Sequence, residues 1–232
     1  MREIVFDTET TGLSPAAGDR MVEIGCVEIF NRVETGRHFH AYFNPERPMP
    51  AEAEAVHGLS TIFLSDKPCF HELAEKLLEF IEDSPLVAHN AGFDFGFLNY
   101  ELERCGLPGV SMNRMVDTLA LARQKHPGAK HSLDALCMRF GIDRSHRVKH
   151  GALLDAQLLA QVYVELTGGR QIGLGLVAET GTVSVPQSAG PIIAREPRPP
   201  RPHAALAEEL ERHRAFIAKL VNPLWERFAA AQ

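Results

Sequence analysis

The chain has 232 residues, enough for one domain of about 150–200 residues and a further short segment. Hydrophobic residues make up 45% and charged residues 23%, which excludes wholesale disorder. The net charge of −6 is only weak evidence against a nucleic-acid partner, because a protein that gathers carboxylates around metal ions is acidic too. No apolar run approaches the roughly 18 residues of a membrane span, and the N-terminus lacks the pattern of a secretory signal. We therefore expect a soluble, cytoplasmic protein without a membrane partner.

Hydrophobic periodicity in residues 1–170 predicts strands first and helices later. Short strands are expected at Glu3–Asp7, Met21–Phe30, Arg37–Phe43 and Pro85–Ala88. The first three indicate an antiparallel meander. Helices are expected at about Phe70–Ile81, Phe95–Cys105, Asp117–Lys125, Ser132–Phe140 and Ala152–Leu166. This order indicates an α/β fold with a mixed central sheet flanked by helices.

The composition changes after residue 170. Residues 177–203 contain six prolines and little hydrophobic periodicity, so we expect a flexible linker there. A helical pattern resumes from Ala204 to about Val221, and Pro223 should end it. A short amphipathic helix beyond a linker cannot stabilise itself. The segment 204–232 therefore either docks on a partner or folds back onto the first domain.

Two acidic residues lie at the end of the first expected strand. Asp7 and Glu9 are two residues apart, so their carboxylates share one face of that strand. No Lys or Arg lies between Glu3 and Arg20 to balance these charges. A bound divalent cation would balance them, although a solvated acidic surface is the alternative.

Two further acidic residues follow at the ends of later elements. Asp94 comes after the strand Pro85–Ala88, where it could ligate a metal ion or simply cap the next helix. Asp155 lies in the first turns of the helix Ala152–Leu166 and could be a satisfied buried polar group. His150 is five residues earlier, so we expect it to precede this helix and reach over its N-terminus.

Together, these residues predict a metal-dependent site. Four carboxylates amid apolar residues would be costly to bury without compensation. An all-oxygen donor set suits Mg²⁺ or Mn²⁺ rather than Zn²⁺, and two such ions about 3.5–4 Å apart can clamp a phosphoryl transfer. His150, with an ordinary pKa near 6.5, can take a proton from water at neutral pH.

These motifs resemble those of the DEDDh 3′→5′ exonucleases. The three matching segments are Asp7-Thr8-Glu9-Thr10-Thr11-Gly12, His89-Asn90-Ala91-x-Phe93-Asp94 and His150-x4-Asp155. Gly151, four residues before Asp155, departs from the Tyr-x3-Asp pattern of the sister DEDDy class. The resemblance covers roughly Arg2 to Gly169.

The resemblance implies a ribonuclease H-like fold and the release of 5′-mononucleotides from 3′ ends. It implies that two divalent cations, Mg²⁺ or Mn²⁺, are held by Asp7, Glu9, Asp94 and Asp155, with His150 as general base. The same residues except Asp94 would contact substrate, together with Thr10, Leu13, His57, Asn90 and Phe93. For Leu13, a loop residue tucked onto the core is the alternative. Asp117 fits a family position near the site, where we expect a helix cap or an indirect role rather than metal ligation.

Within this family, three segments are similar to the proofreading epsilon subunits of bacterial DNA polymerase III: Asp117–Ala120, Ser132–Cys137 and His150–Gly169. This likeness implies an exonuclease domain at 1–170, DNA 3′ ends as substrate and a replisome-associated location. It implies docking of 204–232 on the polymerase alpha subunit, and it suggests a small theta-like subunit as a further partner. Gln171–Leu176 is similar to a clamp-binding peptide, although Gly175 stands where a bulky apolar residue would bind better.

Two alternatives remain at this stage. One is an RNA-trimming exonuclease of the same chemistry, which the linker and terminal helix disfavour because such enzymes are typically compact homodimers. The other is a non-catalytic scaffold that joins clamp and polymerase. A scaffold has no need of the full set of Asp7, Glu9, Asp94, His150 and Asp155.

Overall fold

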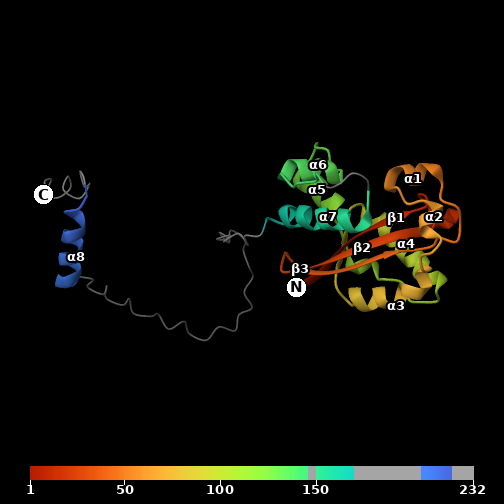
Figure 1. Ribbon diagram of the computed structural model, residues 1–232, viewed down its shortest axis with the longest axis horizontal. Coiled ribbons are helices and arrows are strands. Elements are labelled where there is room, and N and C mark those ends of the chain that lie inside the picture. Colours follow the sequence, from red (N-terminus) through yellow and green to blue (C-terminus); the bar gives the residue numbers. More distant parts are fainter. Residues whose placement is uncertain (146–149, 170–204, 221–232) are drawn as a thin grey trace, which may run out of the picture. The chain divides into compact units, whose positions relative to one another are not determined.

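The computed structural model describes residues 1–145, 150–169 and 205–220 of the chain. It divides into two units, Met1–Leu176 and Val177–Gln232, and each is described by itself (Figure 1). The expected clamp-binding peptide Gln171–Leu176 and the expected linker 177–203 lie outside the described residues.

The first unit is built on a five-stranded mixed sheet. Its strands are β1 (Arg2–Thr10), β2 (Met21–Phe30), β3 (Val33–Tyr42), β4 (Leu86–Ala88) and β5 (Met115–Asp117). They lie in the order β3-β2-β1-β4-β5, with β1–β2 and β2–β3 antiparallel and β1–β4 and β4–β5 parallel. The predicted meander and mixed sheet are thus confirmed.

Seven described helices accompany this sheet in the first unit. They are α1 (Ala51–His57), α2 (Thr61–Leu64), α3 (Phe70–Ile81), α4 (Ala91–Arg104), α5 (Thr118–Lys125), α6 (Leu133–Phe140) and α7 (Ala152–Leu166). Short 3-10 turns occur at Pro15–Ala17 and Met112–Arg114. The predicted bounds of α3 and α7 are confirmed, whereas α1, α2 and β5 were not predicted. None of the described helices is both long and apolar enough to span a membrane.

Alternating side chains of β1 supply two separate cores. Ile4 and Phe6 point into a cluster that includes Phe70, Leu77 and Phe95 from α3 and α4. Val5 points to the opposite face, where it joins Ala156 and Leu159 of α7. Helices α5 and α6 then pack on the outer side of α7 (Figure 1). Because each large buried apolar side chain contributes about 1.5–3 kcal/mol, these two cores hold α4 and α7 firmly on opposite faces of β1.

The second unit contains α8 (Ala207–Ile217), within the range where the sequence predicts a helix. None of its residues is buried. At its N-terminus, Glu209 accepts a hydrogen bond of 2.9 Å from the backbone N–H of Leu206.

Candidate active site

Asp7 and Glu9 lie near the C-terminal end of β1. They alternate with Phe6 and Thr8, so they project toward the face that α7 covers, as Val5 does. Their partners across the antiparallel pair with β2 are Gly25 and Glu23. The predicted shared face of the two carboxylates is therefore found, on the central strand of the sheet.

Gly25 allows α7 to lie directly against the strands beside Asp7. A Cβ atom at Gly25 would come within 2.3 Å of the backbone N and Cα of Leu153, in the first turn of α7. Any side chain here would push the N-terminus of α7 away from β2. The sequence analysis missed this role, although a lone glycine inside a strand is a recognised sign of close backbone approach.

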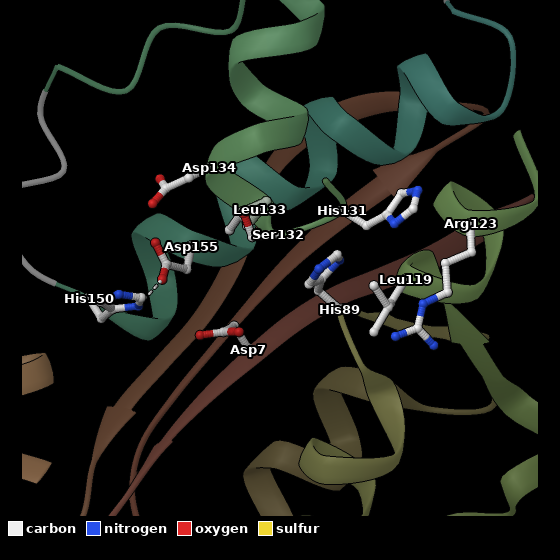
Figure 2. Close-up of a pocket in the computed structure, with 10 residues that line it drawn as sticks. All are labelled: Asp7, His89, Leu119, Arg123, His131, Ser132, Leu133, Asp134, His150 and Asp155. Carbon is white, nitrogen blue, oxygen red and sulfur yellow. Dashed lines mark ion pairs between the residues drawn. The ribbon is translucent and has the colours of Figure 1, made fainter. Parts of the chain in front are cut away.

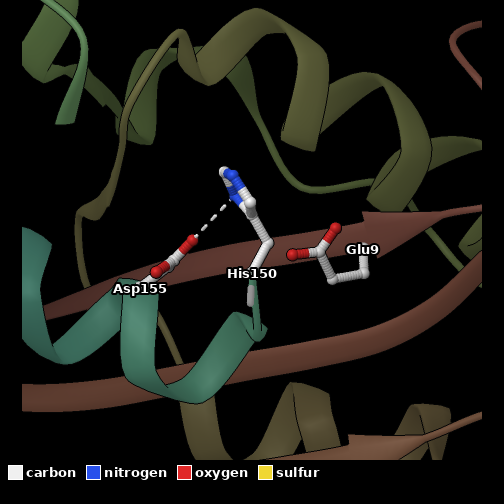
Figure 3. Close-up of side chains that lie close together, drawn as sticks. All are labelled: Glu9, His150 and Asp155. Carbon is white, nitrogen blue, oxygen red and sulfur yellow. Dashed lines mark ion pairs between the residues drawn. The ribbon is translucent and has the colours of Figure 1, made fainter. Parts of the chain in front are cut away.

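The first turn of α7 carries Asp155, and His150 lies just before the helix. Gly151 is the N-cap in an extended conformation, and Asp155 is 3% exposed. His150 Nδ1 lies 3.3 Å from Asp155 Oδ2, so the histidine reaches back over the helix N-terminus as predicted. Ligand atoms of Glu9, His150 and Asp155 all lie within 4.8 Å of one another (Figure 3).

Asp94 approaches from the opposite face of the sheet. Helix α4 begins at Ala91, and its N-cap is Asn90 with a left-handed φ of 62°. Asp94 is thus inside the first turn, and the alternative that it caps the helix is wrong. Its Oδ1 accepts a hydrogen bond of 2.7 Å from the Thr8 hydroxyl, and it is 3% exposed.

Asp117 caps a helix, as expected. Its carboxylate accepts hydrogen bonds from the backbone N–H of Leu119 at 2.9 Å and of Asn90 at 3.1 Å. It therefore joins the start of α5 to the start of α4, which fixes the turn that carries Asp94. This is an indirect role in the site.

The carboxylates raise one another's pKa. Burial raises the pKa of Asp7 well above its usual range, and repulsion from Asp94, Glu9 and Asp155 raises it further. Burial also raises the pKa of Asp94, to about 7. The hydrogen bond from Thr8 favours the charged form and so opposes this rise. Ionised carboxylates gathered this closely need positive charge. Their oxygen atoms are the ligands that hard divalent cations prefer, so the donor set fits such ions.

Two cavities open at this cluster. One, of about 520 Å³, is lined by the following residues (Figure 2): Asp7, His89, Leu119, Arg123, His131, Ser132, Leu133, Asp134, His150 and Asp155. The other, of about 480 Å³, is lined by Thr8, Glu9, Thr10, Thr11, Gly12, Leu13, Pro50, Glu52, Ala53, Val56, His57 and Phe93. Both volumes are typical of small-ligand sites.

Five of the nine predicted substrate-binding residues line the second cavity: Glu9, Thr10, Leu13, His57 and Phe93. Asp7, His150 and Asp155 line the first cavity, and Asn90 lines neither. Leu13 is 85% exposed, so the alternative that it is tucked onto the core is wrong. His57 is buried at the end of α1, and its Nδ1 accepts a hydrogen bond from the Leu59 N–H at 3.0 Å.

The sequence analysis missed the basic residues of the first cavity. Arg123 is on α5, and His131 lies in the segment between α5 and α6. Neither belongs to a motif, and only the fold brings them to the cavity. His89 opens the second exonuclease motif, a signal that could have drawn attention to it.

Comparison with known proteins agrees with this fold. A family model described as exonuclease (RNase T) matches residues 4–163. The structure of exonuclease X in complex with 5′-overhanging duplex DNA is 27% identical, with a TM-score of 0.54, over 71% of this chain and 90% of that one. The nuclease domain of 3′hExo, a DEDDh family member bound to rAMP, shares the fold at 17% identity and a TM-score of 0.62, over 72% of this chain and 91% of that one. The fold is that of these exonucleases.

Curated relatives are closer in sequence. DNA polymerase III subunit epsilon of Rickettsia felis is 47% identical over 96% of this chain and 98% of its own length. The subunit of the same name from Escherichia coli is 44% identical over 93% of this chain and 92% of its own length. The chain therefore belongs to the exonuclease family, and within it to the epsilon subunits of DNA polymerase III. The expected ribonuclease H-like fold and 3′→5′ exonuclease activity are confirmed at this level, and the family implies divalent metal ions.

Proposed function

We propose that the chain removes mispaired 3′-terminal nucleotides from DNA as 5′-monophosphates, in a hydrolysis that depends on two divalent cations, Mg²⁺ or Mn²⁺. The observation that carries this proposal is a cluster of four carboxylates from both faces of the sheet: Glu9 and Asp155 lie beside His150, and Asp7 interacts electrostatically with Asp94, Glu9 and Asp155. No single element supplies this set, so the fold as a whole positions it.

The residues that would hold the cations are Asp7, Glu9, Asp94 and Asp155. When bound, the cations supply the positive charge that stabilises the attacking and leaving oxygens of a phosphoryl transfer. The charges of Asp94, Glu9 and Asp155 all raise the pKa of Asp7, so Asp7 interacts with each of the other three carboxylates that would hold the cations.

His150 serves as the general base in this proposal. With Nδ1–H directed to Asp155 Oδ2, the neutral imidazole presents Nε2 as a proton acceptor. The His150 side chain is 49% exposed, so water can reach the ring. Asp155 thus fixes the ring orientation as well as contributing to the acidic cluster.

The cavity of about 480 Å³ is proposed to hold the terminal nucleoside. Leu13 and Val56 present exposed apolar surface to it, and Phe93 supplies an aromatic wall for the base. Apolar and aromatic side chains recognise a base by stacking without choosing its sequence. A mispaired terminus is easier to unpair than a paired one, so entry to this cavity would favour errors.

The proposed partners follow from the second unit and from the relatives' name. Leu206, Leu210 and Phe216 of the segment around α8 are 68%, 46% and 59% exposed, which suits docking of residues 204–232 in a groove of the polymerase alpha subunit. The clamp is proposed to bind Gln171–Leu176, and a small theta-like subunit is a further proposed partner. This assignment puts the protein in the bacterial cytoplasm, at the replisome.

The test is a gel time course of digestion with Mg²⁺. The substrates are a 5′-labelled DNA primer, paired or 3′-mispaired on its template, and an RNA strand of the same sequence. We expect one-nucleotide laddering that is fastest on mispaired DNA and absent with Asp7→Asn. Preference for RNA would replace the proposal with an RNA-trimming role. Absence of cleavage of every substrate with Mg²⁺ and with Mn²⁺ would favour the scaffold.

A further inference from the structure

The cavity of about 520 Å³ has two chemically different ends. At one end are Asp7, Asp155 and His150 of the acidic cluster. At the other end are Arg123 and His131, with His89 between the two groups (Figure 2). The proposed catalysis uses only the acidic end, so the basic end has no assigned role.

Within residues 1–145, 150–169 and 205–220, Arg123 forms no ion pair with a carboxylate. Asp134, the other acidic residue that lines this cavity, lies 2.8 Å from Arg144. The guanidinium of Arg123 is therefore available to an anion that enters the cavity.

His89 and His131 form the walls of the same end, and His131 Nε2 donates a hydrogen bond of 2.8 Å to the His126 carbonyl. His89 is fixed by a hydrogen bond of 2.9 Å between its Nδ1 and the Thr118 hydroxyl. Burial lowers the pKa of His89, and the charges of His131 and Arg123 also lower it, whereas a hydrogen bond to the His131 backbone and the charge of Asp117 raise it. The three basic side chains therefore lie within one electrostatic environment, which also includes the Asp117 carboxylate. Three nitrogen-bearing side chains from separate segments converge here on one volume.

We propose that Arg123, in the part of the cavity walled by His89 and His131, binds the DNA phosphate that follows the scissile one, counted from the 3′ end. This inference rests on the proposed function: with the terminal nucleoside in the cavity beside Leu13 and the scissile phosphate at the carboxylates, the rest of the strand enters the cavity of about 520 Å³. An arginine fork matches the geometry of a phosphate. The contact makes the enzyme favour a strand over a single nucleotide.

The test compares two substrates in the full chain. One is a single-stranded DNA oligonucleotide, and the other is an aryl ester of thymidine 5′-monophosphate, which has a scissile phosphate and no second one. For Arg123→Gln, we expect the ratio of kcat/KM on the oligonucleotide to that on the ester to fall about tenfold. The salt dependence of oligonucleotide kcat/KM should also become shallower by about 0.7 in logarithmic slope, the amount for one lost phosphate contact on a single strand.

Matched variants and a modified substrate sharpen the result. Lys125→Gln removes a charge from an exposed residue of the same helix that does not line the cavity, and it should leave the ratio unchanged. Arg123→Lys keeps the positive charge, so its ratio of kcat/KM on the two substrates should lie between those of Arg123→Gln and the wild-type protein. A neutral methylphosphonate at the second phosphate should lower wild-type activity to that of Arg123→Gln and leave the variant unaffected.

Two results would overturn the inference. The first is an equal change on both substrates in Arg123→Gln, which indicates a structural role. The second is that the methylphosphonate substitution lowers the activity of Arg123→Gln by the same factor as it lowers wild-type activity. Failure of the proposed function itself is distinguishable, because the wild-type protein would then hydrolyse neither substrate.

Discussion

Helices α7 and α8 use their apolar side chains in opposite ways. Ten of the residues of α7 are buried, whereas none of those of α8 is. The core of the first unit therefore fixes α7, and the side chains at its N-terminus are held with the precision that catalysis needs. Around α8, apolar residues such as Leu210 and Phe216 stay exposed among the described residues, a surface suited to a partner protein.

The largest expected effect comes from His150, which precedes α7, and from Asp7 of β1. His150→Gln removes the proposed base and should lower kcat by about 10²–10⁴-fold, while the increase in Tm on adding Mg²⁺ is kept. Asp7→Asn should abolish both activity and that increase. His71→Gln, an exposed residue of α3, is the control. Indistinguishable metal titrations of the His150 and Asp7 variants would contradict this division of roles.

A second expected effect concerns how closely α7 approaches the sheet. Gly25→Ala places a methyl group against the backbone of Leu153, so α7 must shift and carry Asp155 away from Asp7. We expect a loss of about 10²-fold in kcat, since a misplacement of about 1 Å has that effect. Gly96→Ala on the exposed side of α4, where a Cβ meets nothing, should keep activity and stabilise the helix by about 1 kcal/mol. Full activity of Gly25→Ala would show that α7 tolerates displacement.

The sequence predicted those parts of the site that depend on local periodicity. The i, i+2 spacing of Asp7 and Glu9 and the start of α7 after His150 both follow from local rules. It did not predict that Asp94 comes from the other face of the sheet, because Thr8, which holds it, is 86 residues away in the chain. The short elements α1, α2 and β5 were not predicted either. The two helices have seven and four residues and the strand has three, which is too short for a hydrophobic period to be detected.

The third prediction tests the exposed side of α8. Leu210→Asp should weaken binding of the polymerase alpha subunit about 30-fold, the effect of losing roughly 2 kcal/mol at an interface hot spot. Its exonuclease activity on short DNA should be unchanged, because the site is built entirely in the first unit. Glu211→Gln on the same helix is the control. Undiminished binding in a titration calorimetry experiment would contradict the assignment of residues 204–232.

The smallest expected effect is a gain in the free energy of unfolding when the buried carboxylate of Asp94 is replaced. The pKa of Asp94 is about 7 in the folded chain and near 3.9 when unfolded, so between those pH values the folded state binds more protons than the unfolded state. Without metal, the free energy of unfolding should therefore fall as the pH rises from about 4 to 7, and the full penalty is present above pH 7.

Asp94→Asn relieves part of that penalty and keeps the oxygen that accepts the Thr8 hydrogen bond. In chelator at pH 8, it should raise Tm by about 2–4 °C, which corresponds to roughly 1 kcal/mol for a domain of this size, and the gain should vanish near pH 4. Glu79→Gln, an exposed carboxylate on α3, should leave Tm unchanged. With Mg²⁺ at pH 8, the wild-type protein should have the higher Tm. The cation stabilises the wild-type carboxylate at position 94 more than it stabilises the amide of Asp94→Asn. A metal-free Tm for Asp94→Asn below that of the wild-type protein at pH 8 would mean that the carboxylate is stabilised without a cation.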